Sequence, residues 1–83
     1  MLQKTNTKTT NYDVKGGFYI DVVETESEYI AWMYHKDYDI KAFMFSDDKA
    51  NCGRDAFMSL VDVSVVGFKD DYRRAVIQMG NDD

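Results

Sequence analysis

The fold is decided by residues 18–46, which read FYIDVVETESEYIAWMYHKDYDIKAFMFS. Three stretches are rich in β-branched and aromatic residues, which is typical of β-strands: 18–24, 29–36 and 40–46. Polar breaks at 25–28 and 37–39 separate them. Because loops this short join antiparallel neighbours, the segment predicts a three-stranded antiparallel β-meander.

A long helix is predicted after the polar loop at residues 46–53. Apolar residues recur there at gaps of three and four: Phe57, Leu60, Val61, Val65, Phe68, Tyr72, Val76 and Met79. Asn51 is the expected N-cap, Gly80 the expected stop, and Gly67 a position for a bend. Residues 61–66, VDVSVV, also alternate between apolar and polar side chains and are rich in β-branched valine, so they fit a strand as well. We expect helix there, because the helical period continues on both sides.

The chain of 83 residues has room for one domain. Residues 1–12 are rich in Thr, Asn and Lys without periodicity, which predicts a flexible tail. Residues 13–83 are then a single α+β domain, in which the meander packs on one long C-terminal helix.

The short loops also set the expected register of the sheet. Val23 should lie opposite Ile30, and Asp21 opposite Trp32. In the second hairpin Met33 should face Phe43, and Trp32 should face Met44. One face would then hold Phe18, Ile20, Val22, Ala31, Met33, Phe43 and Phe45. The other would hold Tyr19, Asp21, Val23, Ile30, Trp32, Tyr34, Ala42 and Met44.

A single helix covers only one face, and the aliphatic and phenylalanine face suits it. The second face lacks the polar alternation of a solvated antiparallel sheet. Its Tyr, Trp and Met residues are types found at interface centres. We therefore expect a partner to cover it. The alternative is that the tail or a bent helix covers it, which would make Trp32 an ordinary core residue. A slip of one residue would exchange the faces.

Acidic residues dominate the charge, with 15 Asp and Glu against 10 Lys and Arg, a net charge of −5. Phosphate is repelled by such a chain, so direct binding to nucleic acid is not expected. The acids near the two hairpin turns are Glu24, Glu26, Glu28, Asp37 and Asp39. They would flank the aromatic patch and steer it to a basic partner. The alternative is that they only keep the protein in solution.

Catalytic and metal-binding patterns are not found in the sequence. The single histidine, His35, has no nucleophile at a suitable spacing, and the single cysteine, Cys52, has no partner for a zinc site. We expect no enzyme activity, metal or cofactor. No apolar run is long enough for a membrane span, and the N-terminus has no apolar signal stretch. The expected location is therefore the cytoplasm.

Residues 31–45, AWMYHKDYDIKAFMF, carry a resemblance. They look like small proteins of bacterial genomes and mobile elements, in which an aromatic Tyr-His-x-Asp-Tyr hairpin precedes a helix rich in acids and aromatics. At the level of class, a short acidic domain of this kind is similar to phage-encoded anti-CRISPR proteins.

The resemblance implies a non-enzymatic inhibitor in the bacterial host cell. It would bind a CRISPR effector or another defence nuclease as a mimic of nucleic acid, and would occlude a basic nucleic-acid-binding surface. The residues expected to bind this partner are Tyr19, Asp21, Trp32, Tyr34 and Met44, with the five acids near the turns. The alternative is a structural module that forms a homodimer through the aromatic sheet face.

Overall fold

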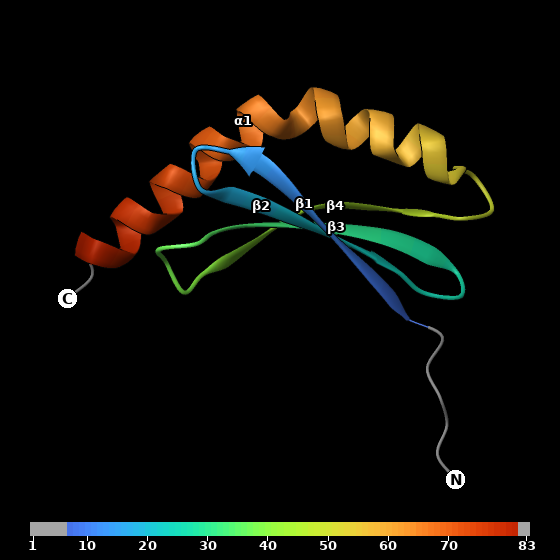
Figure 1. Cartoon of the computed structure of the whole chain (residues 1–83), viewed down its shortest axis with the longest axis horizontal. Helices are drawn as coiled ribbons and strands as arrows, with labels where there is room; N and C mark the ends of the chain where they lie inside the picture. The colour runs from blue at the N-terminus through green and yellow to red at the C-terminus, as the bar shows by residue number, and fades with distance from the viewer. Residues whose placement is uncertain (1–6, 82–83) are drawn as a thin grey trace, which may run out of the picture.

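The computed structural model describes residues 7–81 as an α+β fold of one sheet and one helix (Figure 1). The elements follow the chain as β1 (Lys8–Lys15), β2 (Phe18–Glu24), β3 (Glu28–His35), β4 (Lys41–Asp48) and α1 (Arg54–Asn81). The strands lie in the order β1-β2-β3-β4, and every neighbouring pair is antiparallel. The predicted α+β class is therefore confirmed, but the sheet has four strands, not three.

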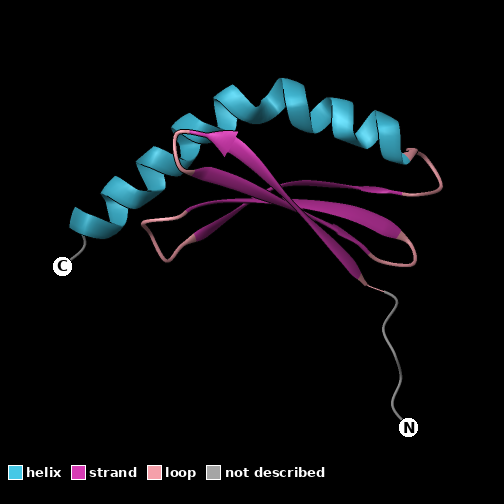
Figure 2. Ribbon diagram, in the orientation of Figure 1, coloured by secondary structure: helices cyan, strands magenta, loops and turns pink. Residues whose placement is uncertain are grey.

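The molecule has two layers, with α1 arched over one face of the sheet (Figure 2). The core between the layers follows from strand alternation and from the helical period. Its buried residues are Phe18, Ile20, Val22, Tyr29, Ala31, Met33, Met44, Cys52, Phe57, Val61 and Tyr72. Packing against α1 thus fixes which side of each strand faces inward.

Strand β1 occupies part of the segment that was predicted as a flexible tail. It pairs with β2 from Lys8 opposite Glu24 to Lys15 opposite Phe18. Tyr12 and Val14 of β1 pack on the core, which holds the strand in place although its other residues are polar. The prediction of a tail over 1–12 is wrong for the strand residues, and residues 1–6 lie outside the described part of the chain.

The turn between β1 and β2 depends on Gly17, which has a φ of +86°. A Cβ there would lie 2.6 Å from His35 Nε2, so a side chain is excluded by the close approach of the imidazole. Gly16 and Gly17 therefore close the hairpin between β1 and β2.

Helix α1 confirms the helical interpretation of residues 61–66. Its predicted ends are less accurate. The Gly53 carbonyl accepts the first helical bond, from Phe57 N–H at 2.9 Å. Asn51 is not the N-cap, because its N–H and Nδ2 bind the carbonyl and carboxylate of Asp48 in the preceding loop. At the other end the helix continues through Gly80 to Asn81.

A β-bulge in β4 changes the predicted register of the second hairpin. The first hairpin pairs as expected, with Asp21 opposite Trp32. In the second, Trp32 pairs with Phe43 and Ala31 with Phe45, so Met44 is an extra residue between them. The predicted pairs Met33–Phe43 and Trp32–Met44 are wrong.

The bulge also reverses three predicted environments. Met44 lies in the core at 5% exposure, whereas Phe43 lies outside at 51% exposure. Ala42, which pairs with Met33, likewise packs against the core instead of lying on the outer side. A run of four apolar residues, AFMF, fits either register, so the sequence pattern could not place the extra residue.

Candidate partner-binding face

The sheet face turned away from α1, which we call the open face, is covered by no element of residues 7–81 (Figure 1). Strand alternation and pairing place its central residues: Tyr19, Asp21, Val23, Ile30, Trp32, Tyr34 and Phe43. All are half-buried by their neighbours except Phe43, which is exposed. Within the described chain, neither the N-terminal segment nor the helix covers Trp32.

Two aromatic pairs lie on the open face. Trp32 and Phe43 meet edge to face, with ring centroids 5.2 Å apart. Tyr19 and Tyr34 stack, with centroids 5.6 Å apart. Rings held by each other lose little conformational freedom when a partner binds, so the pairs form a preorganised apolar surface.

A polar network holds Tyr34 in position. Asn11 Nδ2 donates to Asp21 Oδ1 at 2.9 Å and to the Tyr34 hydroxyl at 2.7 Å. Lys41 Nζ donates to Asp21 Oδ2 at 3.1 Å and lies 5.3 Å from the centroid of the Tyr34 ring. The charge of Asp21 is therefore balanced inside the protein, and this carboxylate positions the aromatic surface.

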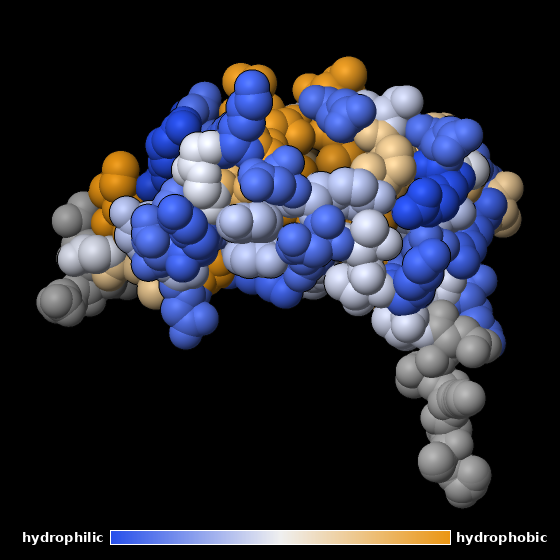
Figure 3. Space-filling view, in the orientation of Figure 1, coloured by the Kyte–Doolittle hydropathy of each residue, from blue (hydrophilic) through white to orange (hydrophobic). Residues whose placement is uncertain are grey.

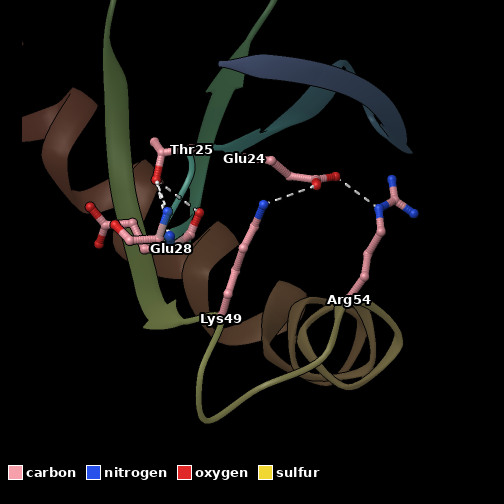
Figure 4. Close-up of polar contacts among 6 residues, drawn as sticks. Glu24, Thr25, Glu28, Lys49 and Arg54 are labelled. Atoms are coloured by element: carbon pink, nitrogen blue, oxygen red, sulfur yellow. Dashed lines mark hydrogen bonds and ion pairs between the residues drawn. The ribbon is translucent and has the colours of Figure 1, made fainter. Parts of the chain in front are cut away.

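Glu24 lies on the helix side of the sheet, where its carboxylate pairs with the side chains of Arg54 and Lys49 (Figure 4). Arg54 Nε donates to Glu24 Oε2 at 2.9 Å, and Lys49 Nζ lies 3.8 Å from Oε1. The hydrogen bond from Arg54 lowers the pKa of Glu24 below its ordinary value, and the positive charges of Arg54 and Lys49 act in the same direction. This cluster fastens the end of β2 to the start of α1, so Glu24 does not belong to the open face.

The other predicted acids occupy three places. Glu28 lies on the open face, opposite Asp48, and Glu26 is exposed in the β2–β3 turn. The Thr25 hydroxyl closes that turn by accepting the Glu28 N–H at 3.0 Å (Figure 4). Asp37 and Asp39 are exposed in the β3–β4 turn.

Of the predicted binding residues, the open face thus brings together Tyr19, Asp21, Glu28, Trp32 and Tyr34. Met44 and Glu24 are excluded from it, one by the bulge and the other by strand alternation.

The sequence did not predict several residues of the open face, among them Phe43, Asp13 and Asp48. Phe43 was assigned to the core because the bulge was not foreseen. Asp13, opposite Tyr19, required recognition of β1, and Asp48, opposite Glu28, required a longer β4. The strand residues of this face include four acids, Asp13, Asp21, Glu28 and Asp48, and one lysine, Lys41. Their net charge is −4 + 1, or −3.

His35 has a structural role at one end of the sheet. Its Nδ1 accepts the Asp37 N–H at 3.1 Å, which leaves the proton on Nε2, and Nε2 donates to the Gly16 carbonyl at 2.9 Å. The Tyr72 hydroxyl accepts the His35 N–H at 3.1 Å and donates to the Ile40 carbonyl at 2.8 Å. These bonds tie the β1–β2 and β3–β4 turns to α1, and they engage both ring nitrogens, including the one that would accept a proton in a general base.

Other reactive groups show no assembled site. Burial raises the pKa of the Cys52 thiol, and the Asp47 carboxylate raises it further, which disfavours the reactive thiolate. Residues 7–81 contain no cluster of three His, Cys, Asp or Glu side chains suited to a metal ion. In the same residues, no helix has both the length and the apolar character needed to cross a membrane.

Comparison of the chain with protein-family models, with curated proteins and with solved structures gives no match. The geometry of the open face is therefore the basis for a functional proposal.

Proposed function

We propose that the chain is a non-enzymatic protein-binding module whose open face docks on a basic surface of a partner protein. The observation that carries this proposal is an uncovered sheet face with two preorganised aromatic pairs and a net charge of −3. Aromatic side chains supply the contact area at interface centres, and surrounding charges steer the approach of an oppositely charged partner. The face has both features on one rigid element.

The partner proposed is a bacterial defence nuclease, such as a CRISPR effector, in the cytoplasm of the host. Nucleases bind phosphate through extended basic grooves, which are the surfaces that attract an acidic face. A bound protein of this size would exclude nucleic acid from such a groove. The class resemblance to anti-CRISPR proteins points the same way, and the protein would act as an inhibitor.

A homodimer through the open face is the competing arrangement. It would place two faces of net charge −3 against each other. Like charges at an interface oppose association. This repulsion favours a partner of opposite charge over a second copy at the open face.

The test is inhibition of purified nucleases from a panel of CRISPR effectors and other defence systems, measured by DNA cleavage as the protein is titrated. Phe43→Ala is the informative variant, because Phe43 is the exposed ring of the Trp32–Phe43 pair on the open face. Tyr38→Ala is its matched control, since Tyr38 is equally exposed at 51% but lies in the β3–β4 turn. We expect Phe43→Ala to weaken inhibition about 30-fold, and Tyr38→Ala to leave it unchanged.

Three outcomes would contradict the proposal. They are no inhibition across the panel, equal loss from both variants, and a stable homodimer whose formation requires Trp32 and Phe43. The last outcome would support the assembly module instead.

A further inference from the structure

The outer side of α1, opposite the sheet, carries an uncharged surface in the first half of the helix. We call it the helix patch; its residues are Ala56, Ser59, Leu60, Val63, Val66 and Gly67, all exposed. Val63 is 77% exposed and Val66 74% exposed, which is unusual for aliphatic side chains at the middle of a helix. Figure 3 shows hydrophobic atoms along the upper edge of the molecule, over α1.

Three residues of the helix patch, Val63, Val66 and Gly67, favour a helix poorly. Glycine and β-branched residues have lower helix propensity than alanine or leucine. A Cβ added at Gly67 would meet nothing within 4 Å, so packing within the described chain does not require glycine there. Val63 and Val66 gain little burial in compensation. These residues disfavour a helix, and their exposure means that burial within residues 7–81 does not offset that cost. Contact with another molecule would offset it.

The shape of the helix patch suits a second helix. A hollow of about 290 Å³ lies beside Gly67, lined by Val63, Ser64, Gly67, Phe68 and Asp71. Val63, Gly67 and Asp71 form one row at spacing i+4, and Ser64 and Phe68 form the next. The hollow is therefore the groove between two rows, widened where glycine has no side chain. Ridges of one helix pack into such grooves of another.

We propose that the helix patch binds the same patch of a second copy, with Val63 of each copy in the groove at Gly67 of the other. Symmetric dimers need a surface that carries both a projection and the hollow that receives it. Val63 and Gly67 supply these one helical turn apart. Mutual insertion requires the two helices to cross in antiparallel directions.

Charge also favours a second copy as the occupant of the helix patch. Two copies that each carry a net charge of −5 repel one another unless they meet through an uncharged surface. The six residues of the helix patch have no charged side chain, and the one acid that lines the hollow, Asp71, is paired with Arg74. The strand residues of the open face carry −3.

The two halves of α1 differ in charge as well. Residues 54–66 contain two Asp and one Arg, a net charge of −1, and residues 67–80 contain three Lys or Arg and two Asp, a net charge of +1. Arg73 and Arg74 pair with Asp70 and Asp71 of the same half, so an antiparallel crossing adds no unpaired like charge from these four residues.

The dimer does not use the residues of the proposed inhibitor surface. Because α1 arches over the sheet with its convex side turned outward, a second helix can cross its middle (Figure 1). Both open faces would point outward. The contact covers only a few helical turns, so we expect a Kd on the order of 100 µM, as for small transient interfaces.

Sedimentation equilibrium from about 10 µM to about 1 mM brackets this Kd and tests the proposal. Gly67→Ala should weaken dimerisation about tenfold, because the added methyl group fills the groove. In the dilute monomer the same variant should raise Tm by about 5 °C, since alanine favours the helix and meets no neighbour. Val63→Gln should also weaken dimerisation. Gly80→Ala is the control, because it makes the same change at an exposed helical glycine outside the patch.

Three results would overturn the proposal. The native chain could remain monomeric at the highest concentration. Gly67→Ala and Gly80→Ala could have the same effect on association. Dimerisation could depend on Trp32 and not on Val63, which would assign it to the open face. Nuclease inhibition by Gly67→Ala is measured in parallel, so failure of the dimer and failure of the proposed function are distinguishable.

Discussion

Residues 7–81 leave both the open face and the helix patch uncovered, yet the two surfaces differ in chemistry. The open face combines aromatic rings with four acids and one lysine, whereas the helix patch is aliphatic and uncharged. Charge acts over a distance that depends on salt, and apolar contact acts only after two surfaces meet. The comparison teaches that one small domain can present two surfaces that favour different partners: a basic protein at the open face and a second copy of the chain at the helix patch.

If the open face and the helix patch are binding surfaces, the stability of the fold should come mainly from the core between the sheet and α1. Phe57→Ala should lower the free energy of unfolding by about 3–5 kcal/mol, because Phe57 is fully buried against Tyr29 and Phe45. Phe43→Ala should lower it by only about 1 kcal/mol, the order of one exposed aromatic pair. Urea denaturation measures both values. A loss for Phe43→Ala as large as for Phe57→Ala would mean that the open face is part of the core.

The second prediction separates the two surfaces by binding. Trp32→Ala should reduce the free energy of binding to an inhibited nuclease by about 2 kcal/mol, as expected for a central aromatic anchor. Val63→Gln, on the helix patch, should leave that affinity unchanged. Calorimetric titration of both variants decides the point. If Val63→Gln weakens nuclease binding as much as Trp32→Ala, the two surfaces do not act separately.

A third prediction concerns the acids of the open face. The double variant Glu28→Gln and Asp48→Asn should slow association with a basic partner several-fold at low salt, because charges at the edge of an interface act mainly on the encounter. The difference should shrink near physiological salt, where the Debye length is about 8 Å. Surface plasmon resonance at several salt concentrations gives the rates. An association rate that does not depend on salt would contradict the electrostatic part of the proposal.

The smallest expected effect lies outside both surfaces, at Glu24. Its pKa is lowered from the ordinary 4.5 by Arg54, so the folded state favours the carboxylate more than the unfolded state does. The resulting stability is complete above about pH 5, and it is lost as pH falls through the lowered pKa.

The native protein and Glu24→Gln should therefore differ most at neutral pH and converge in acid. Thermal melts across this pH range measure the difference, and Arg54→Gln should show the same convergence. If Arg54→Gln leaves the fall of Tm in acid unchanged, a contact other than Arg54 is responsible for the lowered pKa of Glu24.

Several elements could be predicted from the sequence because their periodicity is long and uniform. Strands β2 and β3 and the body of α1 follow this rule, and the pairing of Asp21 with Trp32 came from a short turn. Strand β1 could not be predicted, since only Tyr12 and Val14 show an inward apolar pattern and the pairing with β2 supplies the rest.

The candidate site was predictable where it depends on alternation within one strand. Tyr19, Trp32 and Tyr34 share the open face for this reason. The roles of Glu24 and Asp21 could not be derived, because their cationic partners, Arg54 and Lys41, lie 30 and 20 residues away in the chain. Contacts between distant segments are absent from a local pattern.

The bulge at Met44 has a consequence for insertion and deletion. Trp32 pairs with Phe43 and Ala31 with Phe45, so the ladder on both sides of Met44 would be continuous if Met44 were deleted. Deleting Met44 would keep Phe43 on the open face and Phe45 on the core side, and only one core side chain would be lost. The residues that β4 presents on the open face therefore do not depend on whether the extra core residue Met44 is present.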